Sequence, residues 1–170
     1  MAVVTTVLGS VAAGLLLLWN HTSDQPYSRI EPGLYLGPSV DRPPPGTQAV
    51  VNLCGRPDPY QVGPLLWEPI YEPGPGVAGK EPTLDLLRRV VGFIDEQRRA
   101  DRTTYVHCMV GVNRSAAVVT AYLMKEHGMG RDQALAFLQQ RRPMVQPDPT
   151  LMQLLAKWER ELKGNSGAGR

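Results

Sequence analysis

The chain has 170 residues, with 18 Lys and Arg against 16 Asp and Glu, and so a formal net charge of +2. This length fits one domain, and so small a positive excess excludes a protein organised around a nucleic-acid-binding face, which needs clustered Lys and Arg. A hydrophobic content of 42% is enough for a packed core, whereas two Cys exclude a disulfide scaffold and, with three His, offer few ligands for a structural metal site.

The first 20 residues form an apolar segment that resembles a membrane anchor. Residues 3–19 carry no charged side chain and end in four Leu followed by Trp19. A helix of this length, at about 1.5 Å per residue, spans about 25 Å, the short end of what crosses a bilayer. An interfacial Trp also fits an anchor. We therefore predict an N-terminal apolar helix that anchors the chain in a membrane, with a buried core helix as the alternative.

The flanks of this segment predict how the rest of the chain is placed. The first basic side chains, Arg29 and Arg42, follow it, so the positive-inside tendency predicts a domain that faces the cytosol. No basic region precedes it, as a cleaved signal peptide would require. A mitochondrial or a soluble cytoplasmic location is the alternative. Residues 21–29 are then a polar linker, 30–163 one domain, and 164–170 a disordered tail.

The first half of the domain is predicted to consist of short strands and loops. A buried strand is expected over 49–53, between the Pro-rich residues 43–46 and Cys54-Gly55. A weaker strand is expected over 65–71, because Pro69 cannot donate to a ladder. Residues 72–79 are expected to form a loop from their Pro and Gly content.

The second half is predicted to be helical, apart from a short strand over 104–107. The first helix follows Pro82, which favours the first helical position, and residues 84–94 show apolar side chains at helical spacing. The next helix, over 115–127, is apolar nearly all round, as a buried helix would be, and stops at Gly128.

Two further helices complete the predicted domain. One is expected over 132–140, and the last begins at Asp148-Pro149, with Asp148 as its N-cap. Strands followed by strand-loop-helix units indicate an α/β fold with helices packed on a sheet.

The stretch from Tyr105 to Ser115 carries the chemistry. A strand that ends at Cys108, a tight turn at Gly111 and a helix that begins at Arg114 aim backbone N–H groups and a helix N-terminus at one point, which makes an anion site. The same field lowers the pKa of a cysteine placed there. A guanidinium can hold two oxygens of a tetrahedral oxyanion. Together these residues predict phosphoryl transfer through a covalent thiophosphate.

An inert, buried thiol is the alternative interpretation of a lone cysteine. The spacing His-Cys-x-x-Gly-x-x-Arg-Ser, which runs from His107 to Ser115, argues against it. Average residue usage produces this pattern by chance in such a chain with a probability on the order of 10⁻⁵. The functional interpretation of Cys108 is therefore preferred.

The loop resembles the signature of the cysteine-dependent protein tyrosine phosphatases, and the domain resembles their compact dual-specificity branch. The resemblance covers about residues 27–162 and includes the segments 30–37, 121–124 and 141–143. It implies a compact α/β dual-specificity-phosphatase-type fold, with a central mixed, mostly parallel sheet flanked by helices. It also implies hydrolysis of phosphotyrosine, and of phosphoserine or phosphothreonine, on phosphoproteins, without a metal or an organic cofactor.

The resemblance implies a role for each residue of the loop. Cys108 attacks phosphorus, Arg114 binds the equatorial oxygens, and Ser115 stabilises the thiolate when it departs. His107 braces the loop. The phosphate is cradled by the backbone amides of Met109, Val110, Gly111, Val112, Asn113 and Arg114.

The general acid departs from the family pattern, in which an Asp upstream of the loop protonates the leaving oxygen. Residues 82–87 resemble the corresponding segment of the mitochondrial phosphatidylglycerophosphate phosphatase of this family, and an ungapped alignment then places the acid position at Val77, which cannot donate a proton. Glu72 is the predicted substitute. A missing acid costs about 10²–10⁴-fold, so a slow phosphatase is expected. The other carboxylates considered are Asp58, Glu81 and Asp85.

Two other functions stay open besides a protein phosphatase. The apolar N-terminal segment favours a phosphatase that acts on a membrane lipid monophosphate, so that a phospholipid is the second predicted partner. Val77 favours a weakly active domain that binds phosphorylated partners. The uncharged side chains at positions 109, 110, 112 and 113 favour phosphoproteins or monophosphates over highly phosphorylated lipids.

Cys54 is the second cysteine of the chain, and it closes the predicted strand 49–53. In some members of the family a cysteine near this place traps the nucleophile as a reversible disulfide. The resemblance therefore implies a redox role for Cys54, with a buried apolar thiol as the alternative.

Overall fold

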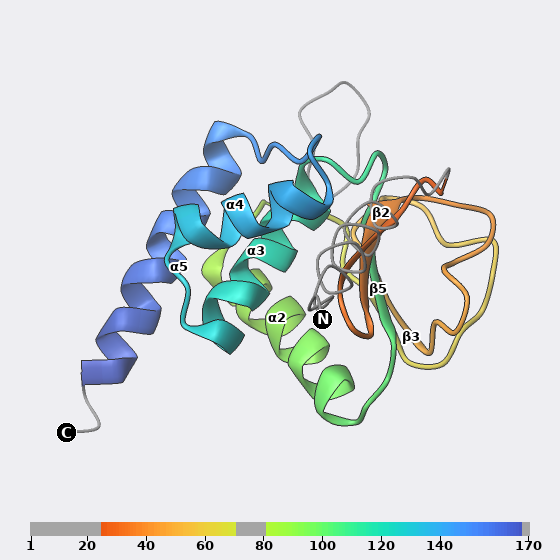
Figure 1. Ribbon diagram of the computed structural model, residues 1–170, viewed down its shortest axis with the longest axis horizontal. Helices are drawn as coiled ribbons and strands as arrows, with labels where there is room; N and C mark the ends of the chain where they lie inside the picture. Colours follow the sequence, from red (N-terminus) through yellow and green to blue (C-terminus); the bar gives the residue numbers. More distant parts are fainter. Residues whose placement is uncertain (1–24, 71–80, 168–170) are drawn as a thin grey trace, which may run out of the picture.

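The computed structural model describes residues 25–70 and 81–167, and a five-stranded sheet lies at their centre (Figure 1). The strand order is β1-β2-β5-β3-β4. The first pair is antiparallel and the other three pairs are parallel, which confirms the predicted mixed, mostly parallel sheet. The strands are β1 (Ser28–Glu31), β2 (Leu34–Pro38), β3 (Ala49–Asn52), β4 (Leu65–Trp67) and β5 (Thr104–Cys108).

Strand β5 is the central strand and it positions the cysteine. It pairs with β2 on one side and with β3 on the other, and all five of its residues are buried. Because parallel strands run in the same direction, their carboxyl ends meet at one edge of the sheet, the usual place for ligand sites in such folds. That edge receives Cys108 from β5 and Cys54 from the residues after β3.

The described residues also form four helices, and all four lie on one side of the sheet in Figure 1. The central one, α3, contacts the other three helices as well as β2 and β5, and every residue from Arg114 to Met124 is buried. This agrees with its apolar character on all sides. The helices are α2 (Leu84–Arg99), α3 (Arg114–His127), α4 (Arg131–Arg141) and α5 (Pro149–Gly167).

Two of the predicted helix caps agree with the structure, and the predicted start of the first helix does not. Gly128 ends α3 with a φ of 63°, and Asp148 caps α5 by accepting the Leu151 N–H at 2.9 Å, both as predicted. The start of α2 differs from the prediction. Its N-cap is Thr83, whose hydroxyl accepts the Leu86 N–H at 3.2 Å. Pro82 therefore precedes the cap and does not occupy the first helical position.

Three further predicted boundaries differ from the structure by more than one residue. Strand β1 begins at Ser28, inside the predicted linker 21–29, because Ser28 pairs with Leu36. Strand β4 ends at Trp67 and not at residue 71, in agreement with the missing N–H of Pro69. Helix α5 continues to Gly167, beyond the predicted domain end at 163, since extending a formed helix needs no new nucleus.

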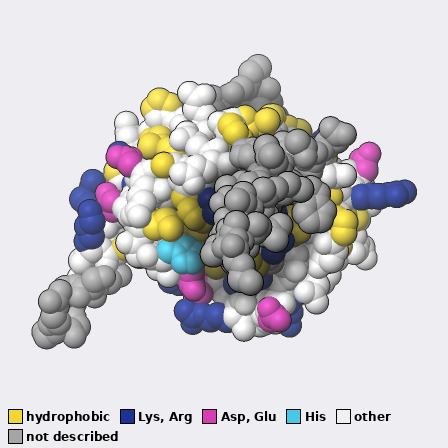
Figure 2. All heavy atoms as spheres, viewed as in Figure 1, with side chains coloured by type: hydrophobic (Ala, Val, Ile, Leu, Met, Phe, Trp, Pro, Cys, Tyr) yellow, Lys and Arg dark blue, Asp and Glu magenta, His cyan; other side chains and the backbone are white. Residues whose placement is uncertain are grey.

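Across residues 25–70 and 81–167, none of the helices combines the length and hydropathy that a bilayer-spanning helix needs. The predicted apolar helix of residues 1–20 lies outside the described residues, and so does almost all of the predicted loop 72–79. On the face shown in Figure 2, basic and acidic side chains are both scattered around the rim, and neither kind forms one continuous patch.

Trp158 packs the last helix, α5, against the core. It is 4% exposed, and its Nε1–H donates to the carbonyl of Ala121 in α3 at 3.0 Å. Leu151, Leu154 and Leu155 of the same helix join the core beside it. These residues form the face of α5 that packs against the rest of the domain.

Trp158→Ala is expected to lower the free energy of unfolding by about 3–5 kcal/mol, the usual cost of removing a buried large aromatic side chain. The control Trp158→Phe keeps most of the apolar contact and loses one hydrogen bond, at a cost of about 1 kcal/mol. Urea unfolding monitored by circular dichroism measures both. A Trp158→Ala protein as stable as the wild type would show that α5 contributes little to the core.

Candidate active site

The loop from Cys108 to Arg114 connects β5 to α3 and is called the Cys108 loop below. Cys108 is 2% exposed, and its Sγ accepts the Gly111 N–H at 3.3 Å. The Ser115 hydroxyl lies 3.2 Å from the same sulfur and can donate to its thiolate. Two donors therefore converge on one buried sulfur atom.

These contacts make Cys108 an unusually acidic thiol. Burial by itself raises the pKa of Cys108, but the hydroxyl and N–H of Ser115, the Arg114 guanidinium and the Gly111 N–H lower it, and the pKa ends below its ordinary value. A thiolate, and not a thiol, is the nucleophilic form of cysteine. The structure thus provides a nucleophile that is ionised at lower pH than a free cysteine.

The carbonyl groups of four consecutive loop residues, 109–112, are all bound from outside the loop. Because a trans peptide unit is planar and rigid, its C=O and N–H point in opposite directions. Four carbonyls held outward therefore turn the N–H groups of residues 110–113 inward, toward the space above the sulfur. The donors are, in order, the Ser39 N–H at 3.3 Å, Arg142 Nη2 at 3.4 Å, Arg142 Nε at 2.7 Å and the Gln146 N–H at 2.8 Å.

Gly111 is required at the turn of the loop. Its φ of +71° is in the left-handed region, and a Cβ atom there would lie 2.3 Å from the carbonyl carbon of Gly37 in β2. Only glycine accepts both the dihedral angle and the close approach. The loop is thereby held against the end of β2 in a conformation that other residues do not reach.

Arg114 and Asn113 occupy the end of the loop. Arg114 is 2% exposed, and its Nη1 donates to the carbonyls of Leu53 and Ile70, both at 3.2 Å. The Asn113 side chain exchanges two hydrogen bonds with Asp148, the N-cap of α5, at 2.9 and 2.8 Å. The side chain of Asn113 thus ties the loop to α5, which leaves only its backbone N–H to face a ligand.

His107 lies behind the loop among buried groups. It is fully buried and stacked on Tyr105, with ring centroids 5.3 Å apart. Its Nε2 is 3.1 Å from the Asp58 carboxylate, and its Nδ1 is 3.9 Å from the Cys54 sulfur. The imidazole is thus packed between Tyr105, Asp58 and Cys54, an arrangement compatible with the predicted bracing role.

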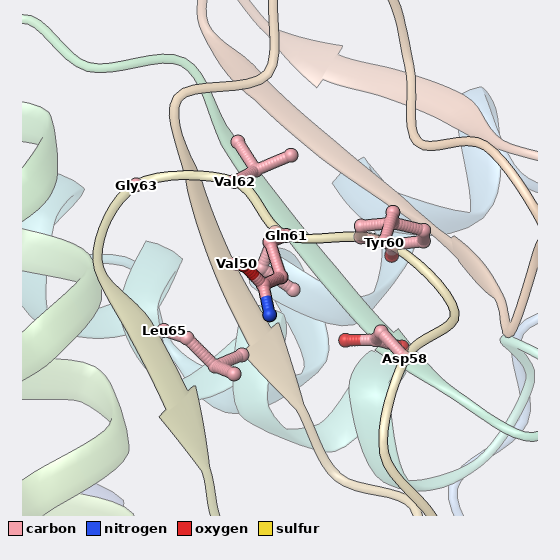
Figure 3. A pocket seen from close by; sticks show the side chains of 7 residues that line it. All are labelled: Val50, Asp58, Tyr60, Gln61, Val62, Gly63 and Leu65. Carbon is pink, nitrogen blue, oxygen red and sulfur yellow. The ribbon is translucent and has the colours of Figure 1, made fainter.

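Asp58 was one of the alternatives for the general acid, and its placement disfavours that role. Its side chain is 3% exposed and turned toward His107. Figure 3 shows the carboxyl group near the Tyr60 ring in a pocket of about 280 Å³ that Val50 and Leu65 also line. A general acid must reach the leaving oxygen of the substrate, and a carboxyl group that is 3% exposed and lies against His107 is poorly accessible for that role.

The remaining carboxylates are placed as follows. Glu72 and Val77 lie outside the described residues. Asp85 is in the first turn of α2 with a side chain 77% exposed, and it pairs with Arg88, which supports its role as an N-terminal helix charge. Glu81 is exposed and precedes α2. Glu72 as the acid stays a prediction.

Cys54 is a fully buried free thiol at the same edge of the sheet. Burial, and then the neighbouring Cys108, raise the pKa of Cys54 to about 11. The two cysteines are therefore tuned in opposite directions, and Cys54 is not a second nucleophile. Its redox role stays a prediction.

Arg142, Ser39, Gln146 and Asp148 are residues of the site that the sequence did not identify. The segment 141–143 contributes to the family resemblance, but nothing in its spacing indicates a contact with residues 110 and 111. In residues 25–70 and 81–167, no group of three or more His, Cys, Asp or Glu side chains could hold a metal ion.

Comparison with known families and sequences agrees with this geometry. The family model described as "Dual specificity phosphatase, catalytic domain" matches residues 77–161. Dual specificity protein phosphatase 16 of Homo sapiens is 30% identical over 150 residues, which cover 83% of this chain and 22% of that protein. Dual specificity protein phosphatase 8 of Homo sapiens is 32% identical over 80% of this chain and 22% of that protein. The chain spans about a fifth of the length of these relatives.

Solved structures share the fold over most of the chain. Human DUSP28 is 28% identical with a TM-score of 0.71, and the match covers 81% of this chain and 99% of that one. PTPMT1 in complex with PI(5)P is 20% identical with a TM-score of 0.72, over 84% of this chain and 99% of that one, and it shows similarity of fold alone. The family match includes the Cys108 loop, and the solved structures cover the sheet and helices that position it. The chain therefore belongs to the dual specificity phosphatase family.

Proposed function

We propose that this chain is a cysteine-dependent phosphatase that hydrolyses phosphate monoesters on phosphoproteins through a phosphocysteine intermediate. The observation that carries the proposal is a buried sulfur with a lowered pKa at the focus of inward-facing backbone N–H groups. The family match and the relatives named dual specificity protein phosphatases support it.

The first half of the proposed reaction transfers the phosphoryl group to the enzyme. The inward N–H groups of the Cys108 loop and the Arg114 guanidinium bind the phosphate oxygens. The Cys108 thiolate attacks phosphorus, an S–P bond forms, and the P–O bond to the substrate breaks. The departing oxygen takes a proton from a general acid, for which Glu72 is the proposed residue.

The second half regenerates the enzyme. Water attacks the phosphorus atom of the thiophosphate, inorganic phosphate leaves, and the S–P electron pair returns to Cys108. The Ser115 hydroxyl, 3.2 Å from the sulfur, stabilises the returning negative charge by donating to it. The same contact that lowers the pKa of Cys108 therefore also makes sulfur a better leaving group.

The surface of the loop favours substrates with a single phosphate. Met109 is 39% exposed and Val110 is 59% exposed, and residues 109–113 carry no charged side chain. A second phosphate beside the first would meet an apolar side chain without a counter-charge. Membrane anchoring through residues 1–20, with the domain facing the cytosol, is part of the proposal and rests on the composition of that segment.

The proposal is tested by measuring phosphate release from a phosphotyrosine peptide, a phosphothreonine peptide and phosphatidylglycerophosphate in vesicles, with vanadate as inhibitor. Turnover of phosphotyrosine peptide that vanadate blocks and Cys108→Ser abolishes is the expected result. Turnover of the lipid alone would overturn the protein-phosphatase assignment in favour of a lipid phosphatase. Tight capture of phosphopeptide without turnover would show a phospho-binding domain.

Ser115→Ala is expected to raise the pKa of Cys108, because it removes a donor to the thiolate. Thiolate is the reactive form above the pKa, so the midpoint of the pH profile for iodoacetate alkylation of Cys108 moves to higher pH. Mass spectrometry of the alkylated protein measures this. Cys54→Ser is the control and should leave the midpoint unchanged, since the high pKa of Cys54 keeps it unreactive below pH 9. An unchanged midpoint in Ser115→Ala would contradict the role of its hydroxyl.

Glu72→Gln is expected to lower turnover of an alkyl phosphate by about 10²-fold or more, the usual contribution of a general acid. The basic limb of the pH profile should flatten, because the group that must stay protonated is gone. An aryl phosphate, with a better leaving group, should lose less. Glu81→Gln serves as the matched control. Equal rates for Glu72→Gln and wild type on the alkyl phosphate would remove Glu72 from the mechanism.

A further inference from the structure

Arg142 is a buried cation directly after α4, and its side chain is directed at the Cys108 loop. It is 5% exposed, although arginine is rarely so deeply buried without a specific partner. Among the described residues its guanidinium donates to uncharged oxygens: the carbonyls of Gly111, Val110 and Pro26, at 2.7, 3.4 and 2.9 Å, and the Ser28 hydroxyl at 3.3 Å. All four acceptors are uncharged, so these contacts position the loop and the start of β1 and do not form an ion pair.

The two loop carbonyls that Arg142 binds belong to the two peptide units that flank Gly111. One is the unit between Val110 and Gly111, and the other is the unit between Gly111 and Val112. Glycine has the greatest backbone freedom of any residue, so these are the units of the loop most able to rotate. A single guanidinium restrains both of them.

This restraint also orients the N–H group that donates to the sulfur of Cys108. With the carbonyl of Val110 held outward, the N–H of Gly111 points inward, where it donates to Cys108 Sγ at 3.3 Å. With the carbonyl of Gly111 held outward, the N–H of Val112 is turned toward the phosphate space. Rotation of either unit would remove a donor and present a carbonyl oxygen to an anion.

Arg142 is itself held in position on its other side. Its Nη1 donates to the carbonyl of Pro26 and the hydroxyl of Ser28, at the beginning of β1. The guanidinium is thus restrained by Pro26 and Ser28, which lie 116 and 114 positions away in the sequence. Because these contacts form without a ligand, the guanidinium is preorganised to bind the loop.

We propose that Arg142 is a positioning residue of the phosphatase reaction, which holds the peptide units on both sides of Gly111 so that their N–H groups face the sulfur and the phosphate. This inference rests on the proposed function. The hydrogen bonds of Arg142 reach the site through the loop carbonyls, and its positive charge also interacts with Cys108, a contribution that Arg142→Lys retains. A lysine cannot replace it fully, because one ammonium group cannot reach both loop carbonyls and the Pro26 carbonyl with the planar geometry of a guanidinium.

The experiment compares Arg142→Met, Arg142→Lys and the matched control Arg141→Met in the full chain. Arg141 is the adjacent cation, but its guanidinium lies over the Phe137 ring, 3.5 Å from its centroid, and donates to the Phe137 carbonyl. The readouts are kcat and KM on a phosphotyrosine peptide, vanadate affinity, the midpoint pH of Cys108 alkylation, and the melting temperature.

Arg142→Met is expected to lose about 10²-fold in kcat/KM, the effect of displacing a catalytic arrangement by about 1 Å. Its vanadate affinity should fall about 10-fold, and its alkylation midpoint should move to higher pH because the Gly111 N–H no longer faces the sulfur. Arg142→Lys should fall between Arg142→Met and wild type, and Arg141→Met should stay within twofold of wild type. If Arg142 contributed to folding alone, Arg142→Met would lower the melting temperature and leave KM, vanadate affinity and the alkylation midpoint unchanged.

If Arg142→Met matches Arg141→Met in KM, vanadate affinity and the alkylation midpoint, the inference is overturned while the proposed function stands. A wild-type protein that neither binds vanadate nor releases phosphate would instead overturn the proposed function. If Arg142→Met does not fold, Arg142→Lys and Ser28→Ala decide by the same readouts. Ser28→Ala removes one of the bonds that hold the guanidinium, so a small shift of the alkylation midpoint in the same direction is expected.

Discussion

The orientation of the peptide units between Cys108 and Arg114 is the constraint on which the rest of the site depends. A thiolate that is 2% exposed has lost nearly all of its hydration, and such a charge is tolerated only where donors replace the water. The Gly111 N–H and the Ser115 hydroxyl provide them, with the Arg114 guanidinium nearby. The Gly111 N–H faces the sulfur only while the Val110 carbonyl, in the same peptide unit, faces outward.

The fold supplies that constraint from several directions. Strand β5 delivers Cys108 to the carboxyl edge of the sheet, and α3 begins where the loop ends. Ser39, directly after β2, binds the carbonyl of Met109, and the segment between α4 and α5 binds those of Val110, Gly111 and Val112. The loop therefore has no regular secondary structure of its own and still has nearly all of its carbonyls paired, as buried backbone requires.

Membership of the dual specificity phosphatase family and the chemistry of the loop agree, and the opposite pKa shifts of the two cysteines explain why only one of them is the nucleophile. The general acid stays a prediction, in which an ungapped alignment places the family's acid position at Val77 and Glu72 is the substitute. Glu72 and Val77 both lie outside the described residues, whereas Asp58 is turned toward His107 at 3.1 Å. The nucleophilic half of the site is thus well defined by structure, and the acid half rests on sequence.

The parts of the site that could be predicted from the sequence lie on one continuous segment. His107 to Ser115 forms a strand end, a loop and a helix start, and the two donors to Cys108 Sγ, the Gly111 N–H and the Ser115 hydroxyl, come from within this segment. The α/β class, the buried character of α3 and the cap at Asp148 were also predicted from local sequence patterns. Contacts between distant segments were not. Arg142 binds Gly111 across 31 positions, and Asp58 reaches His107 from a loop after β3. Such pairs leave no periodicity or spacing in the chain, because they arise only when the parallel sheet brings its loop ends to one edge and α4 ends beside them.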